Sequence, residues 1–360
     1  MIPSIIIFLI VLSIVVLIHE LGHFVAAKLV GIKVEEFGFG YPPRAVGKKI
    51  GETIYSLNWL PFGGFVRMFG EEEGQMDSKQ KLSAKLSKRA FYHKSKRQRS
   101  LVILAGVAMN LLLGVFCFSL IYSTVGIPQE VDYITVQGIA ANSPAQAAGV
   151  SEGDRVLAID GIAMDQTSDF VDYLKDKKGV QVTVTLERDH KTLQIPVTPR
   201  TSYPPEEGAV GVLVSNYDNV FYPAWQMPFR GVWVGVQETY AWTKMMLEGL
   251  GTMVSGIFKG ATPEVTGPVG IYQITSTVAE QGILPLIKFI GILSINLAVV
   301  NILPLPALDG GRFVFIMIEG IIGRKIKPAI EAYINMAGMA VLIGLMVLVT
   351  IGDVIRLIRG

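Results

Sequence analysis

The chain has 360 residues and a formal net charge of +2 at pH 7; 51% of its residues are hydrophobic and only 17% are charged. Soluble globular domains carry about 25% charged residues, so this composition excludes an ordinary soluble domain and indicates a membrane protein. There is one cysteine, Cys117, which excludes an intrachain disulfide.

Four apolar segments have the length that crosses a bilayer, and they cover roughly residues 3–31, 101–125, 283–303 and 329–351. The first is expected to be a retained span, because the residues before it lack the positive charge of a secretory signal. The loop after it is rich in Lys and Arg, which places that loop in the cytoplasm and the N-terminus outside. With four spans, the C-terminus is extracytoplasmic as well.

The first apolar segment contains His19-Glu20-Leu21-Gly22-His23. On a helix, the four-residue spacing puts both imidazoles on one face, with Glu20 beside them. This pattern is typical of a zinc hydrolase with two histidine ligands and a general base. A chance match on a helix surface is the alternative, and the membrane setting argues against it, because ionisable groups there are costly and mark functional sites.

The cytoplasmic loop contains an alternating, aromatic stretch, residues 52–70, that predicts a β-hairpin around Pro61 and the Gly63-Gly64 pair. The hairpin could capture an extended peptide on its edge, or it could simply cover the end of the metal-binding helix. The basic run from Lys79 to Arg99 abuts the second span, so we expect it to contact anionic lipid and not nucleic acid. Within that span, Asn110 could bond to a neighbouring helix or line the site.

Residues 127–215 read as a soluble insert with four short β-branched runs, 133–136, 155–159, 180–186 and 192–197. The stretch 143–161 resembles the PDZ domain of bacterial membrane proteases. Such domains bind a peptide C-terminus as an added strand, here at a groove expected around residues 208–214. The alternative is that this domain is a rigid spacer that binds no peptide. Residues 216–282 are expected to form an amphipathic extracytoplasmic connector.

The third span ends in a segment, residues 301–312, with two prolines that stop the helix and two glycines that allow a tight return. Its Asp309 can therefore turn back toward the membrane interior. A catalytic zinc with two histidine ligands needs a third protein ligand and leaves a fourth position for water. Asp309 is the best candidate for that ligand, although a solvated turn carboxylate is the alternative. Three weaker candidates are His93, His190 and Glu319.

Together these motifs resemble the site-2 protease family of intramembrane zinc metalloproteases, in its branch of bacterial regulators of sigma-E. The resemblance covers almost the whole chain. The motifs that carry it are His19-Glu20-x-x-His23, Gly38-Phe-Gly40, residues 61–68, Gly106-x-x-x-Asn110, residues 266–271 and Asn301-x-x-Pro304-x-Pro306-x-Leu308-Asp309-Gly310.

The resemblance implies that His19, His23 and Asp309 hold one Zn²⁺ per chain and that Glu20 is the catalytic base. The substrate-binding residues that it implies are Asn301, Gly63, Gly64, Pro304 and Gly38. The implied activity is regulated intramembrane proteolysis of single-span proteins, such as anti-sigma factors or signal-peptide remnants, after extracytoplasmic trimming. This chain has one PDZ domain, whereas some members of the branch have tandem copies. The resemblance therefore does not imply how substrates are gated.

The expected architecture is a polytopic α-helical protein of the bacterial cytoplasmic membrane. It has about four transmembrane helices, a cytoplasmic-side β-hairpin and an inserted extracytoplasmic α+β PDZ domain. The expected divisions are residues 1–126, 127–215, 216–282 and 283–360. The expected partners are transmembrane substrates, lipid and a peptide C-terminus, with the active site near the cytoplasmic face. The alternatives are a catalytically silent PDZ scaffold and a zinc transporter.

Overall fold

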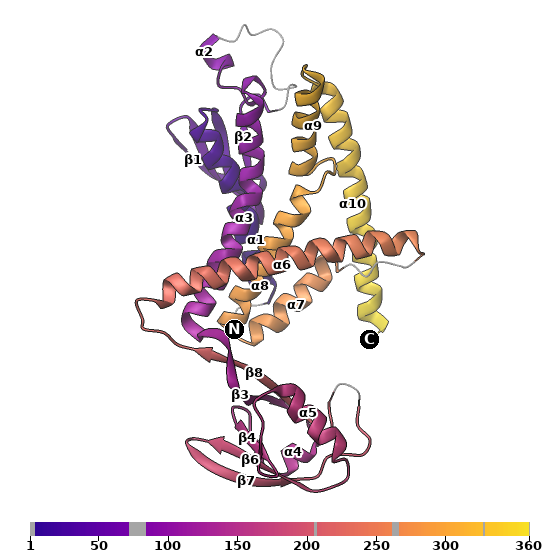
Figure 1. Cartoon of the computed structure of the whole chain (residues 1–360). Helices are drawn as coiled ribbons and strands as arrows, with labels where there is room; N and C mark the ends of the chain where they lie inside the picture. The colour runs from indigo at the N-terminus through magenta and orange to yellow at the C-terminus, as the bar shows by residue number, and fades with distance from the viewer. Residues whose placement is uncertain (1–3, 72–83, 205–206, 261–265, 327, 360) are drawn as a thin grey trace. The chain divides into compact units, whose positions relative to one another are not determined.

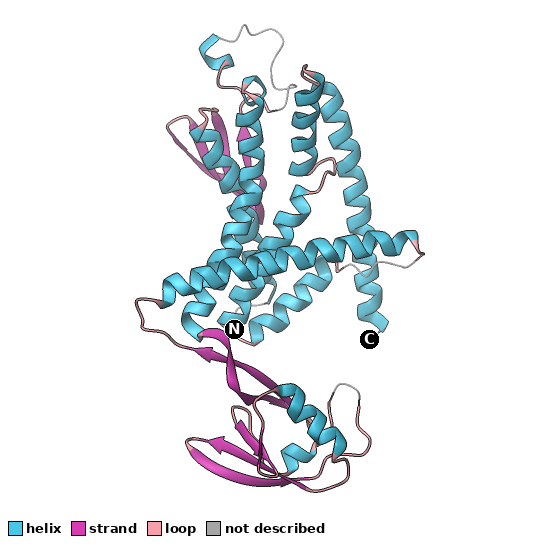
Figure 2. Cartoon of the chain, viewed as in Figure 1, coloured by secondary structure: helices cyan, strands magenta, loops and turns pink. Residues whose placement is uncertain are grey.

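A computed structural model describes residues 4–71, 84–204, 207–260, 266–326 and 328–359. The chain divides into two compact units: Met1–Tyr122 with Gly231–Gly360, and Ser123–Arg230. Figure 2 shows that the first unit is mainly helical and that strands dominate the second. The beginning of the expected basic run, at Lys79, lies outside the described residues.

Four helices of the first unit are long and apolar enough to cross a membrane, as the four apolar segments of the sequence predict. The shortest has 20 residues, and at 1.5 Å per residue it spans about 30 Å, the thickness of a bilayer's hydrocarbon core. These helices are α1 (Ser4–Leu29), α3 (Lys96–Val125), α8 (Ile283–Ile302) and α10 (Pro328–Arg359).

The other helices of this unit are not candidate spans. They are α2 (Ala84–Ser87), the 3-10 helix η2 (Phe91–His93), α6 (Met227–Phe258), α7 (Pro268–Glu280) and α9 (Asp309–Ile322). Helix α6 runs across α3 and α8 (Figure 1), with Trp242 and Met246 packed against buried Phe118 and Ile295. Charged residues are scattered along α6, and it is not among the candidate spans.

The sheet of the first unit consists of β1 (Val34–Ile50) and β2 (Thr53–Met68). The turn between them lies at Gly51, whose φ of +63° suits a residue without a Cβ. Gly38 in β1 pairs with both Phe65 and Ser56, so the first half of β1 lies between the two halves of β2.

The hairpin expected within residues 52–70 is therefore only part of this sheet. Gly63 and Gly64 lie inside β2, and the connection between the two long strands lies earlier, between Ile50 and Thr53. The sequence did not reveal β1, because its prolines and cations are typical of loops and its pairing is made by backbone groups.

The second unit contains one antiparallel sheet in the order β7-β6-β4-β3-β8, with β5 paired to β4. The predicted runs lie within or overlap β3, β4, β6 and β7, and β8 follows the predicted groove loop. The strands are β3 (Ile127–Ile139), β4 (Arg155–Ile159), β5 (Ile162–Ala163), β6 (Val182–Arg188), β7 (Lys191–Val197) and β8 (Val212–Val220).

Two short helices, α4 (Pro144–Ala147) and α5 (Thr167–Asp176), complete the second unit. Phe170 and Leu174 of α5 are buried with Ile134, Val156 and Leu186 from the sheet, so the unit has a hydrophobic core of its own. At about 25 cal/mol per Å² of buried apolar surface, each of these side chains contributes on the order of 2 kcal/mol.

An ion pair ties the loop before β4 to β6. The carboxylate of Asp154 accepts hydrogen bonds of 2.6 Å from Nε and from Nη2 of Arg188, and one of 2.8 Å from the backbone N–H of Ser151. Burial alone would raise the pKa of Asp154, but these hydrogen bonds outweigh it and hold the pKa below its usual range. The ionised form is thus the one that the fold stabilises.

We predict that Asp154→Asn lowers the free energy of unfolding of the isolated segment 123–230 by about 1.5–3 kcal/mol near neutral pH, the usual worth of hydrogen bonds to a charged group. Because the folded pKa is lowered, the loss should be full above the unfolded pKa of about 3.9 and shrink as pH falls through the folded value. Urea unfolding at several pH values measures it. Asp172→Asn, at an exposed carboxylate, is the control; an equal effect in both variants would contradict the prediction.

Candidate metal centre

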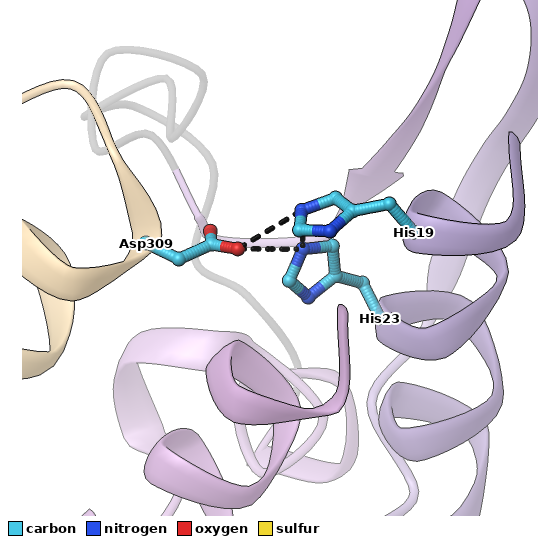
Figure 3. A group of neighbouring side chains, drawn as sticks. All are labelled: His19, His23 and Asp309. Atoms are coloured by element: carbon cyan, nitrogen blue, oxygen red, sulfur yellow. Dashed lines mark hydrogen bonds and ion pairs between the residues drawn. The ribbon is translucent and has the colours of Figure 1, made fainter. Parts of the chain in front are cut away.

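Two elements from opposite ends of the chain bring three possible metal ligands together. His19 and His23 are on α1, and Asp309 is the first residue of α9 (Figure 3). Nε2 of His19 lies 3.1 Å from Nε2 of His23. Asp309 Oδ2 lies 3.0 Å from the first of these nitrogens and 3.2 Å from the second. The three donors thus face one point.

The chain turns sharply between α8 and α9, and this turn places Asp309 beside His19 and His23. Helix α8 ends at Ile302, and the turn that follows includes Ala307 with a φ of +71°. A Cβ at Gly310 would collide with the carbonyl oxygens of Ile302 and Leu303, so only glycine allows the start of α9 to approach the end of α8 this closely. The turn predicted from the prolines and glycines is present.

The three donor groups suit a cation. Asp309 Oδ2 is buried and makes no hydrogen bond to any residue that the structure describes, although both imidazole nitrogens lie within 3.2 Å of it. Atoms at hydrogen-bond distance that are not hydrogen-bonded to one another are expected where the ligand atoms share a central ion. Two imidazoles and one carboxylate are a ligand set that catalytic zinc uses, with a fourth position open to water.

Helix α3 lies directly behind the two histidines. Nδ1 of His23 is 2.8 Å from the carbonyl oxygen of Val102, which keeps the proton on Nδ1 and leaves the Nε2 lone pair free for a metal. This contact needs close packing: a Cβ at Gly106 would overlap both imidazoles, and one at Gly22 would collide with the backbone of Ala105. The Gly106-x-x-x-Asn110 motif was the only sequence signal for this support.

Glu20 is held by the sheet. Its Oε2 accepts a 3.1 Å hydrogen bond from the backbone N–H of Val66 in β2, and its side chain lines the same cavity as the three metal-ligand candidates. The cavity has a volume of about 640 Å³. No residue type marks Val66 for this role, because its backbone makes the contact, so the sequence could not reveal it.

The residues expected to bind substrate are distributed around and beyond this cavity. Asn301 lines it, with Nδ2 3.4 Å from Nε2 of His19, and Gly64 lines it from β2. Gly63 has a φ of +76° and lies against Tyr41, itself a lining residue. Gly38 and Pro304 are not among the described lining residues: Gly38 is paired within the sheet, and Pro304 lies in the turn after α8.

The three weaker ligand candidates have other positions. Glu319 is buried in an ion pair with Arg99, so its charge is already compensated. His93 and His190 are both exposed. None of the three joins the group of closely spaced possible ligand residues.

A charged pair at the cavity was missed in the sequence. Arg312, one turn after Asp309 on α9, lines the cavity and forms an ion pair with Glu71, which follows β2. The charge of Glu71 raises the pKa of Arg312, so the guanidinium stays protonated. The pair joins the end of the sheet to the helix that carries Asp309.

Comparison with known proteins decides the class. The model of peptidase family M50 matches residues 7–345. The chain belongs to peptidase family M50. Its resemblance to the site-2 proteases is thereby confirmed, and M50 membership makes it a membrane-embedded zinc metalloprotease with Zn²⁺ as cofactor.

Several relatives match this M50 chain over nearly its whole length. A protein of Clostridium perfringens is 39% identical, over 96% of this chain and 97% of that one. The zinc metalloprotease RasP of Geobacillus kaustophilus is 32% identical, over 98% and 97% of the two chains. The regulator of sigma-W protease RasP of Bacillus subtilis is 31% identical, over 98% and 99%.

Among solved structures, the PDZ domain of an SdrC-like protein from Listeria monocytogenes is similar at 25% identity. It covers 24% of this chain and 90% of that one, with a TM-score of 0.21.

Proposed function

We propose that this M50 protease cleaves single-span membrane proteins within the bilayer, with His19, His23 and Asp309 as the zinc ligands and Glu20 as the base. The observation that carries the proposal is the convergence of the three donor atoms within 4.8 Å of one another, on the wall of the cavity that Glu20 also lines. A chance His-Glu-x-x-His would have no reason to meet a buried carboxylate from the far end of the chain.

Zinc bound at this point would polarise the scissile carbonyl and lower the pKa of an attacking water. Glu20 accepts one proton from that water and passes it to the nitrogen of the leaving amine, so that the peptide bond breaks with net addition of one water. The hydrogen bond from Val66 N–H to Oε2 orients the carboxylate and leaves Oε1 for the proton transfer.

The substrate must be extended where it is cut, because a helix hides its carbonyls in internal hydrogen bonds. Gly64 and Phe65 of β2 line the cavity, so a peptide aligned along this strand would present its backbone to the metal. Asn301 of α8 lines the same cavity, where its amide could bond to a substrate carbonyl or N–H. Gly38, Gly63 and Pro304 would shape this channel without contacting the reacting bond.

The second unit is proposed to be an extracytoplasmic PDZ domain that selects substrates by their trimmed C-terminus. Strand β8 is at the edge of the sheet, and α5 also contacts it, as the flanks of a peptide groove require. The name of the Bacillus relative supports membrane-anchored regulators, such as anti-sigma factors, as the substrate class.

The ligand roles predict different outcomes for matched variants purified in detergent. Glu20→Gln should keep zinc near one ion per chain and lose cleavage of a transmembrane peptide by at least about 100-fold, because it removes only the proton acceptor. His23→Ala and Asp309→Ala should lose both zinc and activity. Zinc analysis and peptide cleavage are measured on the same samples.

His190→Ala, at a fully exposed imidazole, is the control and should match the wild type. Normal cleavage by Glu20→Gln would contradict the proposed base. Unchanged zinc in Asp309→Ala would rule out Asp309 as the third ligand and leave the proposed protease activity standing.

The proposed topology predicts which cysteines a membrane-impermeant maleimide can reach in intact cells. In a Cys117→Ala background, Ser168→Cys on α5 should react from outside, and Lys88→Cys should react only after the membrane is opened, because the basic loop is proposed to be cytoplasmic. Both positions are exposed. The reverse labelling pattern would contradict this orientation without affecting the metal site.

A further inference from the structure

We infer that Asn110 is a positioning residue for the metal: its amide oxygen accepts a hydrogen bond from Nδ1–H of His19 and so holds Nε2 ready to bind zinc. The inference rests on the proposed ligand role of His19. It assigns a function to Asn110, a polar residue of α3 whose side chain contacts His19.

The geometry starts from a fully buried amide. Asn110 is 0% exposed, and its side-chain nitrogen Nδ2 lies 3.3 Å from Nδ1 of His19. Its oxygen Oδ1 is buried with no hydrogen-bond partner among the described residues. A buried amide oxygen without a partner costs about 1–3 kcal/mol, so this arrangement suggests that the amide also has a second, better orientation.

The chemistry of the ligand requires that orientation. Nε2 of His19 faces Asp309 and His23, so the metal would bind there, and the proton of the neutral ring must then be on Nδ1. Of the two polar atoms of the Asn110 amide, only the oxygen Oδ1 can accept a hydrogen bond from an N–H at Nδ1. A 180° rotation of the Asn110 amide brings Oδ1 to the place of Nδ2, where it accepts this hydrogen bond.

The observed orientation fits the other tautomer. With the proton on Nε2, the lone pair of Nδ1 accepts from the Asn110 amide, and Nε2 lies 3.0 Å from Oδ2 of Asp309. An amide can therefore serve both states of His19 by rotating, because it carries a donor and an acceptor on the same carbon. A leucine of similar size could serve neither.

The other histidine, His23, has a comparable hydrogen bond at Nδ1, but its acceptor is a backbone carbonyl that cannot rotate. His23 Nδ1 faces the carbonyl of Val102, which has no donor to offer. Val102 and Asn110 lie on one α3 face, with Gly106 between them giving room for both rings. Ser294 on α8 donates a 2.8 Å hydrogen bond to the backbone oxygen of Asn110. The contact between α3 and α8 at this position therefore uses the backbone of Asn110, and its side chain remains available to His19.

The test uses the full chain in detergent and measures the zinc dissociation constant by competition with a chelator of known affinity. Asn110→Leu should weaken zinc binding about 10- to 100-fold, the usual effect of removing such a supporting hydrogen bond. Asn110→Asp retains an oxygen acceptor and should bind within about threefold of the wild type, or more tightly. Ser119→Ala removes a different buried polar group, a hydroxyl, from α3 and should leave the zinc affinity unchanged.

Cobalt substitution checks the fold of Asn110→Leu: saturated with Co²⁺, it should still show the visible bands of a four-coordinate site. Two results would overturn the inference: zinc affinity of Asn110→Leu within twofold of the wild type, or Asn110→Asp binding as weakly as Asn110→Leu. The variant His19→Ala distinguishes a wrong ligand assignment from a wrong positioning role. If it keeps wild-type zinc affinity, the ligand assignment is wrong; if it loses zinc while Asn110→Leu does not, only the positioning role is wrong.

Discussion

The ligand atoms of His19, His23 and Asp309 come from two distant parts of the chain and lie within 4.8 Å of one another in a buried position. The arrangement of the helices in the first unit depends on keeping these three atoms together. His19 and His23 are 6% and 7% exposed, and the Asp309 carboxylate is only slightly more accessible. Without a common partner, such groups would carry a large desolvation cost. A bound cation compensates that cost, so the metal would hold α1 to α9 as well as provide the chemistry.

The neighbouring elements each satisfy one remaining atom of this group. Helix α3 supplies an acceptor for His23 and, by our inference, one for His19. Strand β2 donates a backbone N–H to Glu20, and α8 places the Asn301 amide beside Nε2 of His19. Close approach is possible because Gly22 of α1 meets the α3 backbone at Ala105, while Gly106 of α3 leaves room for both imidazoles. The supporting atoms lie on helices and a strand, so the site is held rigidly.

The parts of this site that the sequence revealed are those with local patterns. The spacing of His19 and His23 gives one helix face, and the prolines and glycines around Asp309 indicate a tight turn. Apolar length indicated the four spans. The hidden parts are contacts between distant segments: the double pairing of β1 with β2, the hydrogen bond from Val66 to Glu20 and the pair of Arg312 with Glu71. Backbone atoms carry the first two, and these leave no trace in residue type.

The central claim is that one zinc ion is bound by the two histidines of α1 and the carboxylate of α9. X-ray absorption spectroscopy at the zinc edge of the purified protein tests it most directly. The account predicts two imidazole nitrogens and the remaining ligands as oxygens, at about 2.0–2.2 Å, with no sulfur. A sulfur shell at about 2.3 Å, or a single imidazole, would contradict it.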